Sequence, residues 1–141
     1  MSLGKTFRFG IHNETGQEID ADECTIKANF WDIDGAFSGE VTVFSNDAAI
    51  GSGAYIAYDT YDNSTNQYVG GTFELEVTYN NGDTPDGNVE VYIEYSTDGG
   101  TSWPDQGGGD PTEAEADLIK VLNIPDQTVS GTEVFRTSFR L

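Results

Sequence analysis

Apolar and polar side chains alternate without interruption over residues 89–95, Val-Glu-Val-Tyr-Ile-Glu-Tyr. Val91 and Ile93 fall on one side of this run, while Glu90 and Glu94 fall on the other. A period of two residues is the pattern of a β-strand with one buried and one solvated face. We therefore predict a strand here, with its valine and isoleucine side chains in the core and its glutamates in water.

Further segments have the length and composition of strands, and stretches rich in glycine, asparagine and aspartate separate them. The predicted strands are residues 5–11, 24–31, 41–45, 54–58, 71–80, 89–95, 118–124 and 133–141. These strands and turns predict an all-β fold, an antiparallel β-sandwich of about eight strands in jelly-roll or immunoglobulin-like order. The length of 141 residues suits a single domain, residues 1–141.

The most regular runs also predict which side chains form the core and which connections are short. The side chains expected to be buried are Phe7, Phe9, Phe73, Leu75, Val77, Val91, Ile93, Phe135 and Phe139. The opposite faces of the same runs carry Glu74, Glu90, Arg136 and Arg140, which we expect to face solvent. Residues 81–88 contain Asn-Gly and Asp-Gly pairs, and they are predicted to join two strands as a hairpin.

The chain carries a formal net charge of −19, from 25 acidic and 6 basic residues. Such a surface repels the phosphates of nucleic acids and of anionic lipids, so we expect binding to neither nucleic acid nor membrane. Residues 1–5 lack the apolar core of a signal peptide. We therefore expect synthesis in a host cytoplasm without export by the usual route. The single cysteine, Cys24, can form no internal disulfide and is predicted to be buried.

Residues 32–35, Asp-Ile-Asp-Gly, are the most metal-like fragment, because many calcium loops begin with carboxylates two positions apart. The later ligands of such a loop are missing, so we interpret the fragment as an ordinary turn. His12 is the only histidine, and with a single cysteine it completes neither a zinc site nor a Ser-His-Asp triad.

The acidic residues expected on strand faces, Glu74, Glu76, Glu90 and Glu94, could suggest glycosidic acid and base catalysis. They are predicted to lie on flat, solvated faces rather than in a pocket that would separate their pKa values. We accordingly predict no enzyme, and no catalytic, cofactor-binding or metal-binding residues.

Residues 96–103 place Ser96, Asp98, Gly100 and Trp103 at the spacing Ser-x-Asp-x-Gly-x-x-Trp. This motif resembles the Asp-box of sialidase-type β-propellers, which is a structural hairpin in that family. A propeller would need several copies and more residues than this chain has. We predict a structural role, in which Asp98 bonds backbone amides of the turn and Trp103 packs over it.

The C-terminal half resembles small β-sandwich virion proteins of tailed bacteriophages in the order of its motifs. An alternating strand is followed by residues 96–104, glycines at 107–109, an apolar strand, and residues 131–132 before the last strand. The resemblance implies a non-enzymatic structural protein of the virion, most simply a capsid decoration (cement) protein docked on the shell. A tail-associated structural protein is the near alternative, and the first half of the chain matches no motif.

The same resemblance implies that the partners are the major capsid protein or tail proteins. It also implies a homo-oligomer, and a trimer suits a protein that sits at local threefold axes. Residues 1–5 and 107–117 lack core-forming side chains, so we expect both segments to order on docking.

A carbohydrate-binding β-sandwich module is the other interpretation of the chain. Trp31, Tyr61 and Tyr68 are candidates to contact a partner or to stack on sugar rings. Trp31 faces away from the predicted buried side of its strand, and the two tyrosines fall in residues 59–68, a polar stretch predicted to be an exposed loop.

Overall fold

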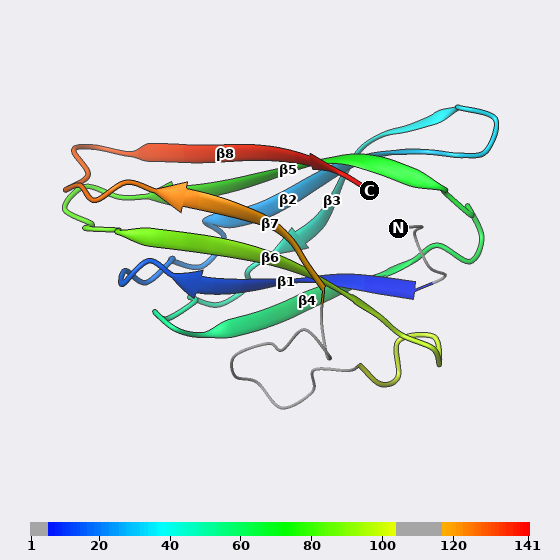
Figure 1. The fold of residues 1–141 in the computed structure, drawn as a ribbon, viewed down its shortest axis with the longest axis horizontal. Coiled ribbons are helices and arrows are strands. Elements are labelled where there is room, and N and C mark those ends of the chain that lie inside the picture. The colour runs from blue at the N-terminus through cyan, green and yellow to red at the C-terminus, as the bar shows by residue number, and fades with distance from the viewer. Residues whose placement is uncertain (1–5, 104–116) are drawn as a thin grey trace.

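The computed structural model describes residues 6–103 and 117–141, which contain eight β-strands (Figure 1). These are β1 (Thr6–Glu14), β2 (Cys24–Trp31), β3 (Phe37–Ser45), β4 (Tyr55–Asp62), β5 (Gly70–Tyr79), β6 (Gly87–Tyr95), β7 (Asp117–Ile124) and β8 (Glu133–Arg140). Within those two ranges, no helix is long and apolar enough to cross a membrane. The expected docking segments lie outside the described residues, apart from Asp117 at the start of β7.

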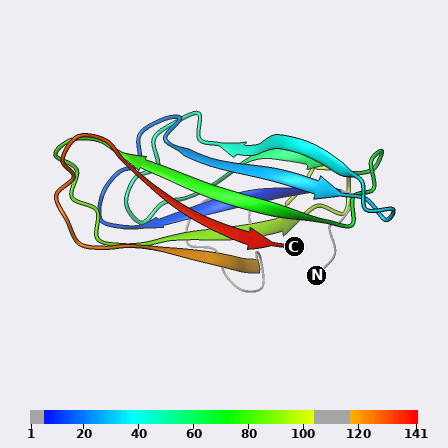
Figure 2. The ribbon, with the colours of Figure 1, turned by 90° about the horizontal axis from the view of Figure 1, so that it is seen from above.

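The strands form two antiparallel sheets that pack face to face, so the predicted all-β sandwich is confirmed (Figures 1 and 2). One sheet has the order β4-β1-β6-β7, and the other has the order β3-β2-β5-β8. This order differs from the immunoglobulin arrangement, in which strands A, B, E and D share one sheet. Only β2–β3 and β6–β7 are neighbours both in the described sequence and in a sheet.

The core lies between the sheets and takes its side chains from the inward face of each strand. The predicted apolar faces of the regular strands point into this core, with Phe7 and Phe9 from one sheet against Phe30 and Phe73 from the other. Cys24 is fully buried as expected, and this burial raises the pKa of its thiol. The fully buried positions include Phe7, Phe9, Ile11, Ile26, Phe30, Phe44, Leu75, Val77, Val89 and Val91.

The last strand departs from the prediction because it lies at the edge of its sheet. Phe135 and Phe139 pack against the core but are half-buried, although the sequence predicts full burial. A strand at an edge has a neighbour on one side only, so its inward side chains remain partly open to water. On its other face Arg136 and Arg140 are exposed, as predicted.

The predicted hairpin over residues 81–88 is wrong, because β5 and β6 belong to different sheets. The connection instead crosses from one sheet to the other. The amide of Asp86 donates to the carbonyl of Thr15, just beyond β1, and the amide of Gly82 donates to the carbonyl of Val129. β5 and β6 each have an apolar face. Because the two strands lie in opposite sheets, both faces point toward the same core.

Several strands extend past their predicted ends, and β3 and β4 extend furthest, because irregularities in register interrupt the period of two. β3 begins at Phe37 rather than at residue 41, and its pairing with β2 shifts register twice. β4 continues to Asp62, so the predicted loop over residues 59–68 is partly strand. Asp59 has a left-handed backbone with φ of 58°, which breaks the local alternation within β4.

Candidate functional site

The turn that follows β6 is built around the carboxylate of Asp98. The amides of Thr101 and Ser102 donate to Asp98 Oδ1 at 3.1 and 2.9 Å, and the hydroxyls of Ser96 and Ser102 also donate to this carboxylate. The amide of Gly100 in turn donates to Ser96 Oγ at 2.8 Å. The prediction that Asp98 bonds backbone amides is therefore confirmed.

Trp103 ends this turn and lies against β1 as well as over the turn. An added Cβ at Gly100 would stand 3.7 Å from Trp103 Cζ2, so the indole passes close to the turn backbone. The guanidinium carbon of Arg8 lies 4.4 Å from the centre of the indole, within the range of a cation–π contact. The motif thus contacts β1 as well as β6, and its purely structural role stays a prediction.

The hydrogen bonds of this turn predict an acid transition. The side-chain and backbone bonds from Ser102, with that from Ser96, lower the pKa of Asp98 to about 2. Because the folded pKa lies below the unfolded value, the ionised turn is favoured above about pH 4, and this contribution is lost as the pH falls through about 2. NMR signals of the Thr101 and Ser102 amides should therefore titrate with a midpoint near 2, whereas an isolated peptide of residues 96–103 should titrate near 3.9. A midpoint near 3.9 in the folded chain would contradict the bonding seen here.

A polar network covers the outer face of the β4-β1-β6-β7 sheet, and it includes a glutamate that the sequence places in water. Glu94 is 1% exposed. Arg8 Nε and Tyr55 Oη each donate to Glu94 Oε2 at 3.0 Å. The tyrosine reaches the glutamate across Gly10, where an added Cβ would stand 1.9 Å from Tyr55 Oη. The prediction for Glu94 is therefore wrong, because a partner 86 positions away in the sequence compensates its burial.

His12 continues this network along β1 and β6. Its Nε2 lies 2.8 Å from Glu14 Oε1, and its Nδ1 lies 3.2 Å from Glu90 Oε1. Tyr92 Oη also donates to Glu90 at 3.0 Å. Among the described residues, no group of three or more histidine, cysteine, aspartate or glutamate side chains could hold a metal ion.

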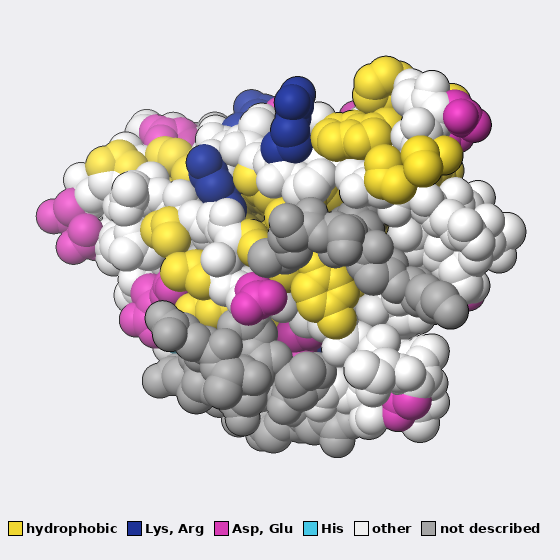
Figure 3. Space-filling view, turned by 45° about the vertical axis from the view of Figure 1, so that its right-hand side comes forward, with side chains coloured by type: hydrophobic (Ala, Val, Ile, Leu, Met, Phe, Trp, Pro, Cys, Tyr) yellow, Lys and Arg dark blue, Asp and Glu magenta, His cyan; other side chains and the backbone are white. Residues whose placement is uncertain are grey.

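The turn between β2 and β3 carries an exposed apolar surface, which we call the apolar tip and define as Ile33, Phe37 and Val69. These side chains are 85%, 67% and 44% exposed. Val69 joins the group because its amide donates to the carbonyl of Trp31 at the end of β2. Figure 3 shows hydrophobic side chains gathered at the upper right, where this turn projects in Figure 1. Asp32 Oδ1 closes the turn by accepting hydrogen bonds from the backbone amides of residues 34 and 36.

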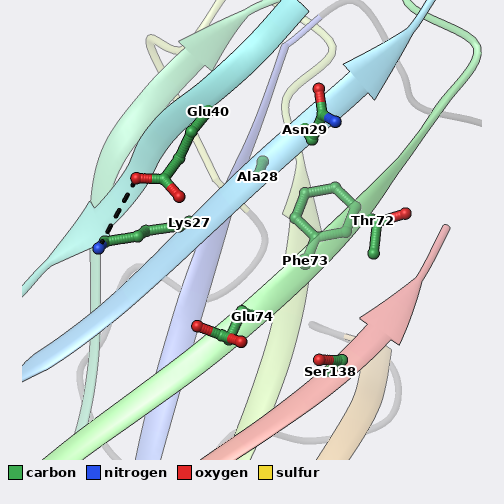
Figure 4. Close-up of a pocket in the computed structure, with 8 residues that line it drawn as sticks. All are labelled: Lys27, Ala28, Asn29, Glu40, Thr72, Phe73, Glu74 and Ser138. Atoms are coloured by element: carbon green, nitrogen blue, oxygen red, sulfur yellow. Dashed lines mark ion pairs between the residues drawn. The ribbon is translucent and has the colours of Figure 1, made fainter. Parts of the chain in front are cut away.

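Next to the tip, the outer face of the β3-β2-β5-β8 sheet has a shallow hollow of about 380 Å³. We call it the polar groove, and it is lined by Lys27, Asn29, Glu40, Thr72, Glu74 and Ser138. Figure 4 shows these side chains standing on four adjacent strands, with Lys27 and Glu40 turned toward each other. The two charged groups form an ion pair with an N–O distance of 3.7 Å.

The carboxylates considered for glycosidic catalysis are divided between the two sheets. Glu74 and Glu76 belong to β5, while Glu90 and Glu94 belong to β6 in the other sheet. A hydrogen bond with Glu76 raises the pKa of Glu74, and Arg136 Nε donates to Glu76 Oε1 at 3.1 Å. The four carboxylates therefore do not gather at one site, whereas glycosidic catalysis needs a pair of them on either side of the same glycosidic bond.

The aromatic residues predicted to contact a partner occupy two kinds of position. Tyr61 and Tyr68 are half-buried against Phe30, with ring centres 4.8 and 5.1 Å away, and burial raises the pKa of Tyr61. Both tyrosines thus pack at the rim of the core. Trp31 lies on the outer face between the apolar tip and the polar groove, and Phe37 meets its ring edge to face at 6.4 Å.

Sequence reasoning missed the apolar tip, although the sequence contains a signal for it. Ile33 is an isoleucine inside an Asp-x-Asp-Gly turn, a place where polar residues are usual. An isoleucine in such a turn cannot reach the core. The structure therefore adds Ile33, Phe37 and Val69 to the candidate contact residues.

Comparison with known proteins gives no relative of this chain: no protein-family model, no curated protein and no solved structure matches it significantly.

Proposed function

We propose that this chain is a non-enzymatic structural protein of a tailed-bacteriophage virion, most simply a capsid decoration protein. In this proposal it docks on the major capsid protein through the apolar tip. A tail-associated structural protein is the alternative, and it would use the same surface on a different partner. The resemblance of the C-terminal half to virion proteins supports a place in the phage particle. The exposed apolar tip supports docking on a partner protein through this surface.

The observation that carries the docking proposal is the exposure of Ile33 and Phe37 on a projecting turn. A large apolar side chain in water loses the stabilisation that burial would give it, about 1.5–3 kcal/mol for a residue of this size. Clusters of such side chains mark surfaces that bind other proteins. The strand pairing of β2 with β3 and the Asp32 turn hold both side chains outward, so docking needs little rearrangement of this part of the chain.

The charge of the chain supports assembly onto a partner. A net charge of −19 keeps free copies apart in solution, because like-charged molecules repel one another. Binding then requires a partner surface that is apolar or basic where the tip lands. A homotrimer around a local threefold axis would bring several tips to one part of the shell.

Fractionation of virions tests this proposal. Particles from a culture of the encoding phage are purified, washed in rising salt and resolved on a gel. We expect many copies of this chain per particle, and we expect the apolar contacts to keep a large part of them bound at high salt, because salt screens charge but not apolar burial. Recovery of the chain only in the infected-cell lysate, and never in the particle, would refute the proposal.

A further inference from the structure

We propose that the outer face of the β3-β2-β5-β8 sheet binds a neutral oligosaccharide. One sugar ring would stack on Trp31, and the hydroxyls of the next would bond in the polar groove. This binding activity goes beyond docking through the apolar tip, and it uses a different set of side chains.

The position of Trp31 suits stacking because its ring lies against a glycine. An added Cβ at Gly70 would stand 2.4 Å from Trp31 Cζ2 and 2.6 Å from Cε2, so the indole rests where a side chain would otherwise project. Trp31 is half-buried, so part of its ring remains open to solvent. Polarised C–H groups of a sugar are attracted to the electron-rich face of an aromatic ring.

Arg140 is the residue that such a sugar would meet first. Its guanidinium carbon lies 5.6 Å from the centre of the indole, near the limit of about 6 Å for a cation–π contact. The side chain is exposed, so it can swing aside at little cost. Its N–H groups would then donate to the hydroxyls of the stacked sugar.

The polar groove offers the mixture of donors and acceptors that hydroxyl groups require. A sugar hydroxyl donates one hydrogen bond and accepts others, as do Thr72 and Ser138. Lys27 supplies a donor, and Glu74 supplies acceptors. The volume of about 380 Å³ falls within the range of about 300–1,000 Å³ typical of small-molecule sites.

The charge of this face indicates a neutral ligand. The strand register turns equal numbers of cations and anions outward here, namely Lys27, Arg136 and Arg140 with Glu40, Glu74 and Glu76. Half of the six basic residues of the chain thus lie on one face and balance its acids. The rest of the chain is strongly acidic and would repel an anionic polysaccharide before it reached the groove.

An NMR titration provides an internal control, because the chain has two tryptophans. The indole N–H signals of Trp31 and Trp103 are followed while cellohexaose, chitohexaose, maltohexaose or xylohexaose is added to about 10 mM, enough to saturate a site with a Kd of about 1 mM. We expect at least one of these sugars to shift the Trp31 signal while the Trp103 signal stays in place. An oligogalacturonate of the same length, which is anionic, should shift neither.

Two variants decide whether the shift reports this site. Trp31→Ala should weaken binding by at least about tenfold in calorimetry. Thr72→Val keeps the shape of the side chain and removes one hydroxyl, so it should weaken binding about two- to tenfold while the fold is retained. Val121→Ala, on the other sheet, is the matched control and should bind as the wild type does.

Three outcomes would overturn the proposal. The first is that no neutral sugar shifts the Trp31 signal. The second is that Thr72→Val and Trp31→Ala both bind as tightly as the wild type. The third is that the Trp31 signal broadens with protein concentration and ignores sugar, which would show that a second copy of the chain covers this face.

Discussion

Replacing Phe30 by alanine should lower the free energy of unfolding by about 3–5 kcal/mol. Phe30 is fully buried at the centre of an aromatic cluster that joins both sheets. Its ring centre lies 6.2 Å from that of Phe7 and 5.6 Å from that of Phe73, and the rings of Tyr61 and Tyr68 pack on it. Alanine would leave a cavity between rings that cannot all collapse into it. Urea denaturation followed by circular dichroism measures the change.

Phe37→Ala is the matched control for this prediction, because it removes the same side chain from the same sheet. Phe37 is 67% exposed, so its loss should change the free energy of unfolding by no more than about 0.5 kcal/mol. Equal costs for the two substitutions would mean that the core is not centred on Phe30.

Gly10→Ala should lower the free energy of unfolding by at least about 2 kcal/mol, although alanine is normally better tolerated than glycine in a strand. The added Cβ would stand 1.9 Å from Tyr55 Oη and 2.2 Å from Tyr55 Cζ, so the tyrosine must move. Movement breaks its 3.0 Å hydrogen bond to Glu94, a carboxylate buried among strands. Overpacking and the loss of a buried hydrogen bond then add together.

A double-mutant cycle separates this clash from a general effect of changing Gly10. In a Tyr55→Ala background the space above Gly10 is open, so Gly10→Ala should cost much less there than in the wild-type chain. The coupling free energy should be about 1–3 kcal/mol, as for residues in direct contact. A coupling near zero would contradict the placement of Tyr55 across Gly10.

The alternation of apolar and polar residues was sufficient to predict strands that carry no extra residue of their own, even where a neighbouring strand is bulged. β2, β5 and β6 follow the period of two, and the sequence locates each to within two residues. β3 and β4 were predicted too short because register shifts and Asp59 break the period. A bulge adds a residue to one strand, which reverses the alternation beyond it.

The arrangement of the strands could not be predicted in the same way. Alternation states which side of a strand is apolar but not which strand lies beside it. The chain crosses between sheets after β5, although Asn-Gly and Asp-Gly pairs in residues 81–88 favour a hairpin. The burial of Glu94 likewise depends on Arg8 and Tyr55, which the fold brings to it from two other strands.

The candidate site could be predicted only where its residues are close together in the sequence. The turn at Ser96, Asp98, Gly100 and Trp103 is local, so its spacing alone was enough to predict its bonding. The polar groove draws residues from four strands of the described fold, and no short motif marks it. Trp31 was identified as outward-facing by alternation, but the glycine beneath it comes from β5.

Docking through the apolar tip is tested most directly by rebinding the chain to particles from a phage that lacks its gene. The wild type is compared with Ile33→Asp/Phe37→Ser, and with Leu118→Asp/Val121→Ser as a control. The control makes the same chemical change at exposed apolar positions of β7, which are 48% and 38% exposed. We predict that the control binds the particles as the wild type does, and that the tip variant binds at least about tenfold more weakly. Equal binding of the tip variant and the wild type would contradict the proposed docking surface.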